Sequence, residues 1–187
     1  MKKYIFLDRD GVINRDPKTA STYVTKWSEF HFLPRVKQAI RLLAKAEYSI
    51  FIISNQAGVS KGFYTKKELK KITDKMLKEI KRARGKIKKV LYCTHRTEDN
   101  CNCRKPKTGL FDKIPDKEKV RFSRCYFIGD SERDVITAKR AGLKSILVLS
   151  GKTDGKKLRG FTAKPDMVKK DLRDAAMWVI QKDKNKK

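Results

Sequence analysis

Three aspartates of this sequence have the residue type and spacing needed to hold a cation and to attack phosphorus. Asp8 and Asp10 lie two residues apart after an apolar run, and Asp130 follows another such run. Carboxylates that gather at one place repel one another unless a cation lies among them. Hard oxygen ligands with room for water and a phosphate suit Mg²⁺. Because a carboxylate is also a nucleophile that can form an aspartyl-phosphate, the three residues predict Mg²⁺-dependent phosphoryl transfer.

Other polar residues would complete that reaction. Asp10 would protonate the leaving oxygen and then activate water. The hydroxyl of Ser54, nearby backbone N–H groups and the ammonium of Lys105 would bind the phosphoryl oxygens as negative charge develops on them. A single aspartate after a strand is more typical of a turn or a helix cap, but the full set favours catalysis.

A cluster of cysteine and histidine side chains lies just before Lys105. The four residues are Cys93, His95, Cys101 and Cys103. Three thiolates and one imidazole form a complete tetrahedral ligand set for Zn²⁺, with no position left for a substrate. We therefore expect a structural zinc that stiffens this loop, so that Arg104 and Lys105 reach the phosphate. The remaining cysteine, Cys125, lies in an apolar run and is expected in the core.

Five short apolar runs predict the strands that must position these residues. The runs are 4–7, 49–53, 90–92, 125–128 and 145–149. They are continuous rather than alternating, which is typical of strands buried on both faces. Helical patterns lie between them, beginning at Pro34, after Thr65, and near residues 131 and 171. The alternation predicts a doubly wound, Rossmann-like α/β fold: a mainly parallel five-stranded sheet with helices on both faces.

The carboxyl ends of the predicted strands bring the candidate residues together. Ligands of doubly wound folds bind at that edge of the sheet. Asp8 follows the first strand, Ser54 follows the second, the Cys/His cluster follows the third and Asp130 follows the fourth. The polar side chains therefore converge on one edge from four separate segments of the chain.

Length and composition narrow the remaining possibilities. The chain has 187 residues, and none of its apolar runs approaches the roughly 18–20 residues needed to cross a bilayer. The first residues are charged again by Asp8, which argues against a secretory signal peptide. We expect a single domain, residues 1–182, with a basic tail, 183–187, in the reducing cytoplasm and without disulfides.

The order of these motifs resembles the haloacid dehalogenase superfamily of phosphatases. The motifs are D-x-D-G-V at 8–12, an apolar strand ending in Ser54, then Lys105, and G-D-x-x-x-D at 129–134. The resemblance implies that Asp8 is the nucleophile and Asp10 the general acid and base. It also implies Mg²⁺ held by Asp8, Asp130 and the main-chain carbonyl of Asp10, with Asp134 orienting the metal shell or Lys105.

Longer segments resemble the D-glycero-D-manno-heptose 1,7-bisphosphate 7-phosphatase family, which sits beside the histidinol-phosphate phosphatases. These segments are 6–14, 23–24, 54–65 and 101–109. The resemblance implies a zinc loop, no large cap domain, and contacts of Asn55 and Arg104 with a sugar phosphate. The expected reaction converts heptose 1,7-bisphosphate to heptose 1-phosphate, with histidinol phosphate as the alternative substrate. Ser131, where the heptose enzymes often have Lys, leaves the substrate preference open.

The net charge suggests a further alternative. The chain carries 48 Lys and Arg against 21 Asp and Glu, a formal charge of +27. Such an excess invites a nucleic-acid partner, but the cations are spread along the chain rather than gathered in a stripe. A nucleic-acid 3′-end phosphatase or a basic nucleic-acid-binding module therefore stays as an alternative to a small-sugar phosphatase. We expect a monomer that has no membrane partner.

Overall fold

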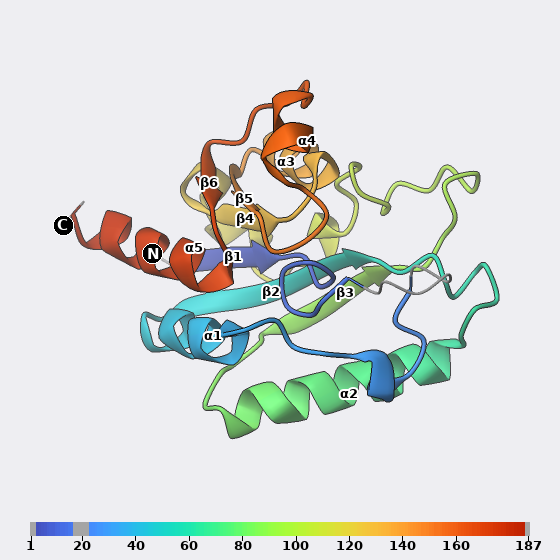
Figure 1. Ribbon diagram of the computed structural model, residues 1–187. Helices are drawn as coiled ribbons and strands as arrows, with labels where there is room; N and C mark the ends of the chain where they lie inside the picture. Colours follow the sequence, from blue (N-terminus) through green and yellow to red (C-terminus); the bar gives the residue numbers. More distant parts are fainter. Residues whose placement is uncertain (1–2, 17–22, 186–187) are drawn as a thin grey trace.

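Six parallel strands form the central sheet of the computed structural model, which describes residues 3–16 and 23–185 (Figure 1). The strands are β1 Lys3–Leu7, β2 Tyr48–Asn55, β3 Lys89–Cys93, β4 Tyr126–Gly129, β5 Lys144–Val148 and β6 Met167–Lys169. Their order across the sheet is β3-β2-β1-β4-β5-β6. The parallel, doubly wound architecture is confirmed. The predicted count of five strands is wrong, because β6 has only three half-buried residues and therefore leaves no apolar run.

Strand β1 shows why the predicted runs are continuous. Ile5 and Leu7 belong to the hydrophobic cluster on one face of the sheet. Tyr4 and Phe6 belong to the cluster on the other face. Because both faces are covered, a polar side chain has no solvated side to occupy within the strand.

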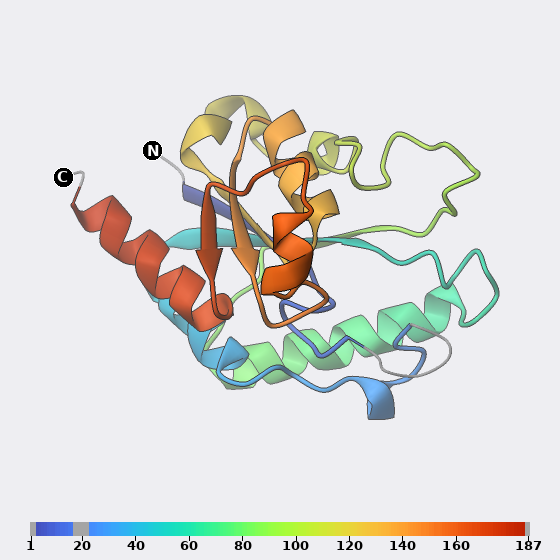
Figure 2. The same cartoon turned by 45° about the horizontal axis from the view of Figure 1, so that its top comes forward.

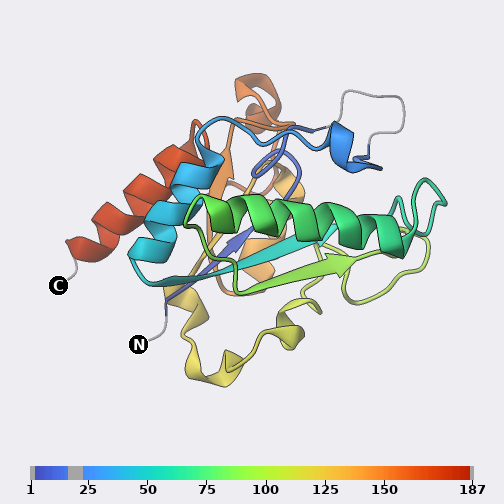
Figure 3. The ribbon, with the colours of Figure 1, turned by 90° about the horizontal axis from the view of Figure 1, so that it is seen from below.

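Helices cover both faces of the sheet. The α-helices of the described residues are α1 Val36–Lys45, α2 Lys66–Arg82, α3 Glu132–Arg140, α4 Gly155–Arg159 and α5 Leu172–Lys184, and four short 3₁₀ helices lie at Trp27–Glu29, Phe111–Lys113, Lys117–Lys119 and Phe122–Arg124. Helices α1, α2 and α5 contribute to the cluster around Ile5 and Leu7, and Figure 3 shows them together on one side of the sheet. Helix α3 and the segment 110–125 pack on the opposite side, as Figure 2 shows.

The ends of two helices follow local sequence signals, whereas α5 departs from its prediction. Thr65 caps α2 through a capping box with Glu68. Gly142, with a φ of +69°, follows α3 in the left-handed conformation that glycine favours.

The predicted tail at 183–187 is wrong at its start, because α5 continues to Lys184. Asp183 holds this last turn on the sheet, since it accepts a hydrogen bond from Tyr48 Oη.

The sheet has its topological switch point between β1 and β4. From β1 the chain moves outward to β2 and β3, and β4, β5 and β6 then extend in the other direction. The edge beyond the carboxyl ends of β1 and β4 is therefore where a ligand is expected. Within residues 3–16 and 23–185, no helix is long and apolar enough to cross a membrane.

Candidate active site

Asp8 and Asp130 lie at the carboxyl ends of the two central strands. Leu7 of β1 pairs with Ile128 of β4, and the backbone N–H of Asp8 donates to the Ile128 carbonyl at 2.9 Å. Asp130 directly follows Gly129, the last residue of β4. The parallel register therefore brings together two carboxylates that lie more than a hundred residues apart in the sequence.

Two glycines enclose the side chain of Asp130. A Cβ added at Gly11 would lie 2.2 Å from Asp130 Oδ2, and one added at Gly151 would lie 2.1 Å from the same atom. Gly11 also has a φ of +79°, a conformation that other residues rarely adopt. The loops after β1 and β5 therefore approach Asp130 more closely than any side chain would allow.

The acidic cluster has the features of a divalent-cation site. Asp8, Asp130 and Asp134 each offer a carboxylate oxygen within 4.8 Å of the others. Burial raises the pKa of Asp130 to about 8, and the charges of Asp134 and Asp8 add to this effect. Burial also raises the pKa of Asp8 to about 6, although Lys105 opposes the shift. This excess of buried negative charge fits Mg²⁺, for which hard carboxylate oxygens are the preferred ligands.

Lys105 is the cation of this cluster. Only 3% of the residue is exposed, and its Nζ lies 2.6 Å from Asp134 Oδ1 and 2.8 Å from Asp8 Oδ2. Asp134 Oδ2 accepts a hydrogen bond of 2.6 Å from Ser131 Oγ. Burial alone would lower the pKa of Lys105, but the charges of Asp134 and Asp8 raise it. Lys105 is therefore a fixed cation beside the proposed nucleophile, and Asp134 is placed to orient it.

Asp10 lies in a separate network of hydrogen-bond donors. Arg9 Nη2 donates to both carboxylate oxygens, at 2.9 Å and 3.1 Å. Asn14 Nδ2 donates to Oδ1 at 2.9 Å, and Gln56 Nε2 donates to Oδ2 at 2.8 Å. Burial alone would raise the pKa of Asp10, but Arg9 and the other donors lower it. This network therefore holds Asp10 as a carboxylate.

Sequence reasoning missed Arg9 and Gln56. Only 1% of Arg9 is exposed, and a buried arginine normally needs a partner for its charge. Gln56 Nε2 donates to Ser54 Oγ at 3.2 Å as well as to Asp10, and Tyr64 Oη donates to Gln56 Oε1 at 2.6 Å. The sequence D-R-D at 8–10 could have pointed to Arg9. An arginine that lies between two site aspartates, directly after a buried strand, is a candidate ion-pair partner for one of them.

Asn55 fixes the main chain of Lys105. Its Nδ2 donates to the Lys105 carbonyl, and its Oδ1 accepts from the Lys105 N–H, each at 3.0 Å. This pair of hydrogen bonds joins the end of β2 to the loop that carries the lysine. The predicted contact of Asn55 with substrate stays a prediction, and the structure gives the side chain a positioning role.

A pocket of about 450 Å³ opens over these residues. Its lining includes Asp8, Asp10, Ser54, Asn55, Lys105, Asp130 and Asp134, which are all sequence-predicted site residues. Arg133 and Lys152, which the sequence did not single out, line it as well. Arg104 does not belong to the lining, because its Nη1 turns to the His95 carbonyl at 3.2 Å. Its predicted contact with substrate therefore stays a prediction.

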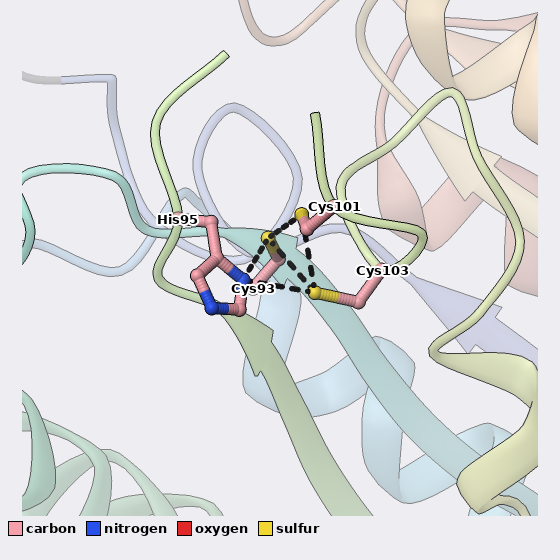
Figure 4. A group of neighbouring side chains, drawn as sticks. All are labelled: Cys93, His95, Cys101 and Cys103. Atoms are coloured by element: carbon pink, nitrogen blue, oxygen red, sulfur yellow. Dashed lines mark hydrogen bonds between the residues drawn. The ribbon is translucent and has the colours of Figure 1, made fainter. Parts of the chain in front are cut away.

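The Cys/His cluster forms a compact group of four ligand atoms (Figure 4). The three Cys93, Cys101 and Cys103 sulfurs lie 3.2–3.6 Å apart. The Nδ1 atom of His95 lies 3.2 Å from the Cys103 sulfur and 3.7 Å from that of Cys93. A tetrahedral site with Zn–S bonds near 2.3 Å places its ligand atoms roughly 3.8 Å apart. The cluster is therefore close to the size that zinc requires, and its chemistry fits zinc.

Loss of the zinc site should reduce stability and activity together. We expect Cys101→Ser to release zinc and to lower the melting temperature, because the thiolates then repel one another without a metal. Phosphatase activity should fall at least about tenfold, since the loop leads directly to Lys105. Zinc content by atomic spectroscopy, a thermal melt and steady-state kinetics would measure these effects. Cys125→Ser is the matched control and should keep its zinc. Full activity in a zinc-free Cys101→Ser protein would contradict the positioning role.

The doubly wound sheet and the Asp8, Lys105 and Asp130 cluster at its switch point define a phosphatase of the haloacid dehalogenase type. In agreement, residues 102–175 match the family model described as HAD-hydrolase-like. The chain belongs to the D-glycero-D-manno-heptose-1,7-bisphosphate 7-phosphatase family within this class, because it shares 30–36% identity with curated members over most of its length.

Three relatives illustrate the similarity. The chain is 36% identical to the β-heptose bisphosphate phosphatase of Neisseria meningitidis serogroup A, over 83% of this chain and 80% of the relative. It is 35% identical to an α-heptose bisphosphate phosphatase of Campylobacter jejuni, over 97% and 98% of the two chains. The crystal structure of the Bordetella bronchiseptica D,D-heptose 1,7-bisphosphate phosphatase, complexed with magnesium and phosphate, superposes with a TM-score of 0.87. That match has 32% identity and covers 96% of this chain and 99% of the other.

Proposed function

We propose that the protein hydrolyses the 7-phosphate of D-glycero-D-manno-heptose 1,7-bisphosphate and releases heptose 1-phosphate. The observation that carries the proposal is the joint presence of Asp8, Lys105 and Asp130 in one pocket of a chain that belongs to this family. The cytoplasmic location and the monomeric state remain predictions from the sequence.

In the first step, a carboxylate oxygen of Asp8 attacks the phosphorus of the 7-phosphate. The bond between phosphorus and the sugar oxygen breaks, and an aspartyl-phosphate forms on Asp8. The sugar oxygen takes a proton from Asp10 as it leaves. Because the network around Asp10 favours its carboxylate form, Asp10 must loosen its contacts with Arg9 and Gln56 before it can supply that proton.

In the second step, water attacks the phosphorus of the aspartyl-phosphate. Asp10 accepts a proton from that water, the bond between phosphorus and Asp8 breaks, and inorganic phosphate leaves. The observed hydrogen bonds already hold Asp10 in the carboxylate form that this step requires. Asp10 thus returns to its proton-bearing form for the next cycle.

The remaining residues neutralise and orient the phosphoryl group. Lys105 Nζ lies beside the attacking carboxylate and would bind a phosphoryl oxygen, as would the Ser54 hydroxyl in the same pocket. When bound, Mg²⁺ supplies further charge neutralisation at the phosphoryl oxygens. Asp8, Asp130 and the main-chain carbonyl of Asp10 are the groups that would hold it, and Asp134 would support them through its contacts with Lys105 and Ser131.

Competing substrates test the proposal. With Mg²⁺ present, we expect kcat/KM for heptose 1,7-bisphosphate to exceed that for histidinol phosphate by at least about 100-fold, because the sugar bisphosphate is the substrate that we propose. Phosphate release should be measured at matched concentrations for both anomers of the bisphosphate, histidinol phosphate and a 3′-phosphorylated oligonucleotide. Equal or faster turnover of either of the last two substrates would contradict the proposal.

A further inference from the structure

The amide of Gln56 links two groups of the site that come from different strands. Its Nε2 donates to Asp10 Oδ2 at 2.8 Å and to Ser54 Oγ at 3.2 Å. Asp10 lies on the loop after β1, whereas Ser54 belongs to the end of β2. Only 1% of Gln56 is exposed, so the amide has little access to water. One buried amide therefore fixes the proposed acid and base and a phosphoryl-binding hydroxyl relative to each other.

The contacts of Asp10 distinguish its two carboxylate oxygens. Oδ1 accepts hydrogen bonds from Arg9 Nε at 3.2 Å, from Arg9 Nη2 at 2.9 Å and from Asn14 Nδ2 at 2.9 Å. Oδ2 accepts from Arg9 Nη2 at 3.1 Å, and its nearest donor is the neutral amide of Gln56. A guanidinium holds a carboxylate more strongly than an amide does. Oδ2 is therefore the oxygen from which a proton can reach the leaving sugar oxygen, and Gln56 sets its direction.

Tyr64 determines which end of the Gln56 amide faces Asp10. Its Oη donates to Gln56 Oε1 at 2.6 Å, and only 4% of the residue is exposed. Burial raises the pKa of Tyr64 above its usual range, so the hydroxyl keeps the proton that it donates. With Oε1 bound to Tyr64, the NH₂ group of Gln56 points to Asp10. Without this donor, Oε1 would be a buried acceptor that lacks a partner, and the amide could turn over.

The loop between β2 and α2 holds the ring of Tyr64 in place. The backbone N–H of Phe63 donates to the Gly58 carbonyl at 2.9 Å, which turns the chain back toward Gln56. A Cβ added at Gly58 would lie 2.3 Å from Tyr64 Cε1, so the ring packs directly on the main chain of residue 58. Thr65 then caps α2. The hydroxyl therefore starts from a fixed point, which a group that orients another group requires.

We propose that Tyr64 is a positioning residue for the proton transfer of the reaction and acts through Gln56 on Asp10 Oδ2. This role rests on the proposed function, in which the leaving oxygen belongs to a sugar and takes a proton as its bond to phosphorus breaks. Of the described residues that line the pocket, neither Tyr64 nor Gln56 is one. Both therefore act by holding Oδ2 in reach of the sugar oxygen, and a misplacement of about 1 Å is enough to slow such a step about 100-fold.

Two phosphate esters with different leaving groups test this role. Tyr64→Phe removes only the hydroxyl, and kcat/KM reports the steps up to the departure of the leaving group. The two esters are heptose 1,7-bisphosphate, whose sugar oxygen needs a proton, and 4-nitrophenyl phosphate, whose phenolate leaves without one. We expect Tyr64→Phe to lower the ratio of the sugar to the aryl kcat/KM by about 10- to 100-fold. Loss of folded protein or of phosphate binding changes both values equally and leaves the ratio intact.

A double variant tests whether Tyr64 acts through Gln56. Gln56→Met removes both polar ends of the amide, and it should lower the ratio at least as much as Tyr64→Phe does. In the Gln56→Met protein, Tyr64→Phe should cause no further drop, because the amide that it orients is gone. Tyr48→Phe is the matched control and should leave the ratio unchanged. It also removes the hydroxyl of a buried tyrosine, but that hydroxyl donates to Asp183.

The outcomes separate this role from the proposed substrate. An unchanged ratio in Tyr64→Phe, or losses of the two single variants that add in the double variant, would overturn the role of Tyr64. A wild-type protein that hydrolyses histidinol phosphate faster than the heptose ester would overturn the proposed substrate alone. Histidinol phosphate is also an alkyl ester and would then replace the heptose ester in the ratio. A wild-type protein that hydrolyses only 4-nitrophenyl phosphate would overturn both.

Discussion

Asp8→Asn should lower kcat by at least about 10⁴-fold, because an amide cannot form the aspartyl-phosphate and binds a divalent cation poorly. Steady-state phosphate release would measure the loss. Acid quenching during turnover, followed by mass spectrometry of the peptide that contains residue 8, should detect the phosphorylated aspartate in the wild-type protein only.

The fold should survive this change. Asn removes one carboxylate from the neighbourhood of Asp130 and Asp134, although it also removes an ion pair with Lys105. We therefore expect a melting temperature within a few degrees of the wild-type value. Asp112→Asn is the matched control, because this exposed aspartate pairs with the surface lysine Lys117 and should leave kcat unchanged. Substantial turnover by Asp8→Asn would exclude the covalent mechanism.

Lys105→Met should damage both catalysis and stability. The variant removes the cation that faces the phosphoryl group, and we expect kcat/KM to fall by about 10³-fold. It also leaves the buried carboxylates of Asp8 and Asp134 without their partner, which should cost about 3–5 kcal/mol of the free energy of unfolding. Steady-state kinetics and urea denaturation would measure the two effects.

A double variant separates the two roles of Lys105. Lys105→Met combined with Asp134→Asn removes the ion pair as a unit, so part of the lost stability should return. Activity should stay low, because the phosphoryl group still lacks its cation. If the double variant regained activity along with stability, Lys105 would serve only to neutralise Asp134.

The sequence was sufficient to predict the strands and the main acidic residues for a simple physical reason. A strand buried on both faces is mainly apolar, and the charged or polar residues at its carboxyl end mark where the chain leaves the core. Asp8 and Asp130 directly follow β1 and β4, whereas Ser54 is the last residue but one of β2, and the structure brings all three into one pocket. The zinc ligands could be predicted equally well, because the residues from Cys93 to Cys103 form one short stretch whose ligand types and spacing are typical of a zinc site.

The direction in which a side chain or a loop turns could not be predicted from the sequence. An arginine is usually exposed, so the burial of Arg9 against Asp10 was visible only in three dimensions. Arg104 follows the zinc loop and was expected at the substrate, but its guanidinium turns to a main-chain carbonyl. Lys152 follows the fifth strand, where no acidic signal drew attention, yet its main chain contacts Asp130.

The close approach of Gly11 and Gly151 to Asp130 divides the pocket into positions of very different mutational tolerance. Any side chain at either glycine would displace the carboxylate, so those two positions admit a single residue type. Arg133, by contrast, lies on an exposed helical turn, where many side chains can be accommodated without disturbing the sheet. Substitutions in such an enzyme would therefore accumulate on the wall of the pocket long before they reached the carboxylates at its centre.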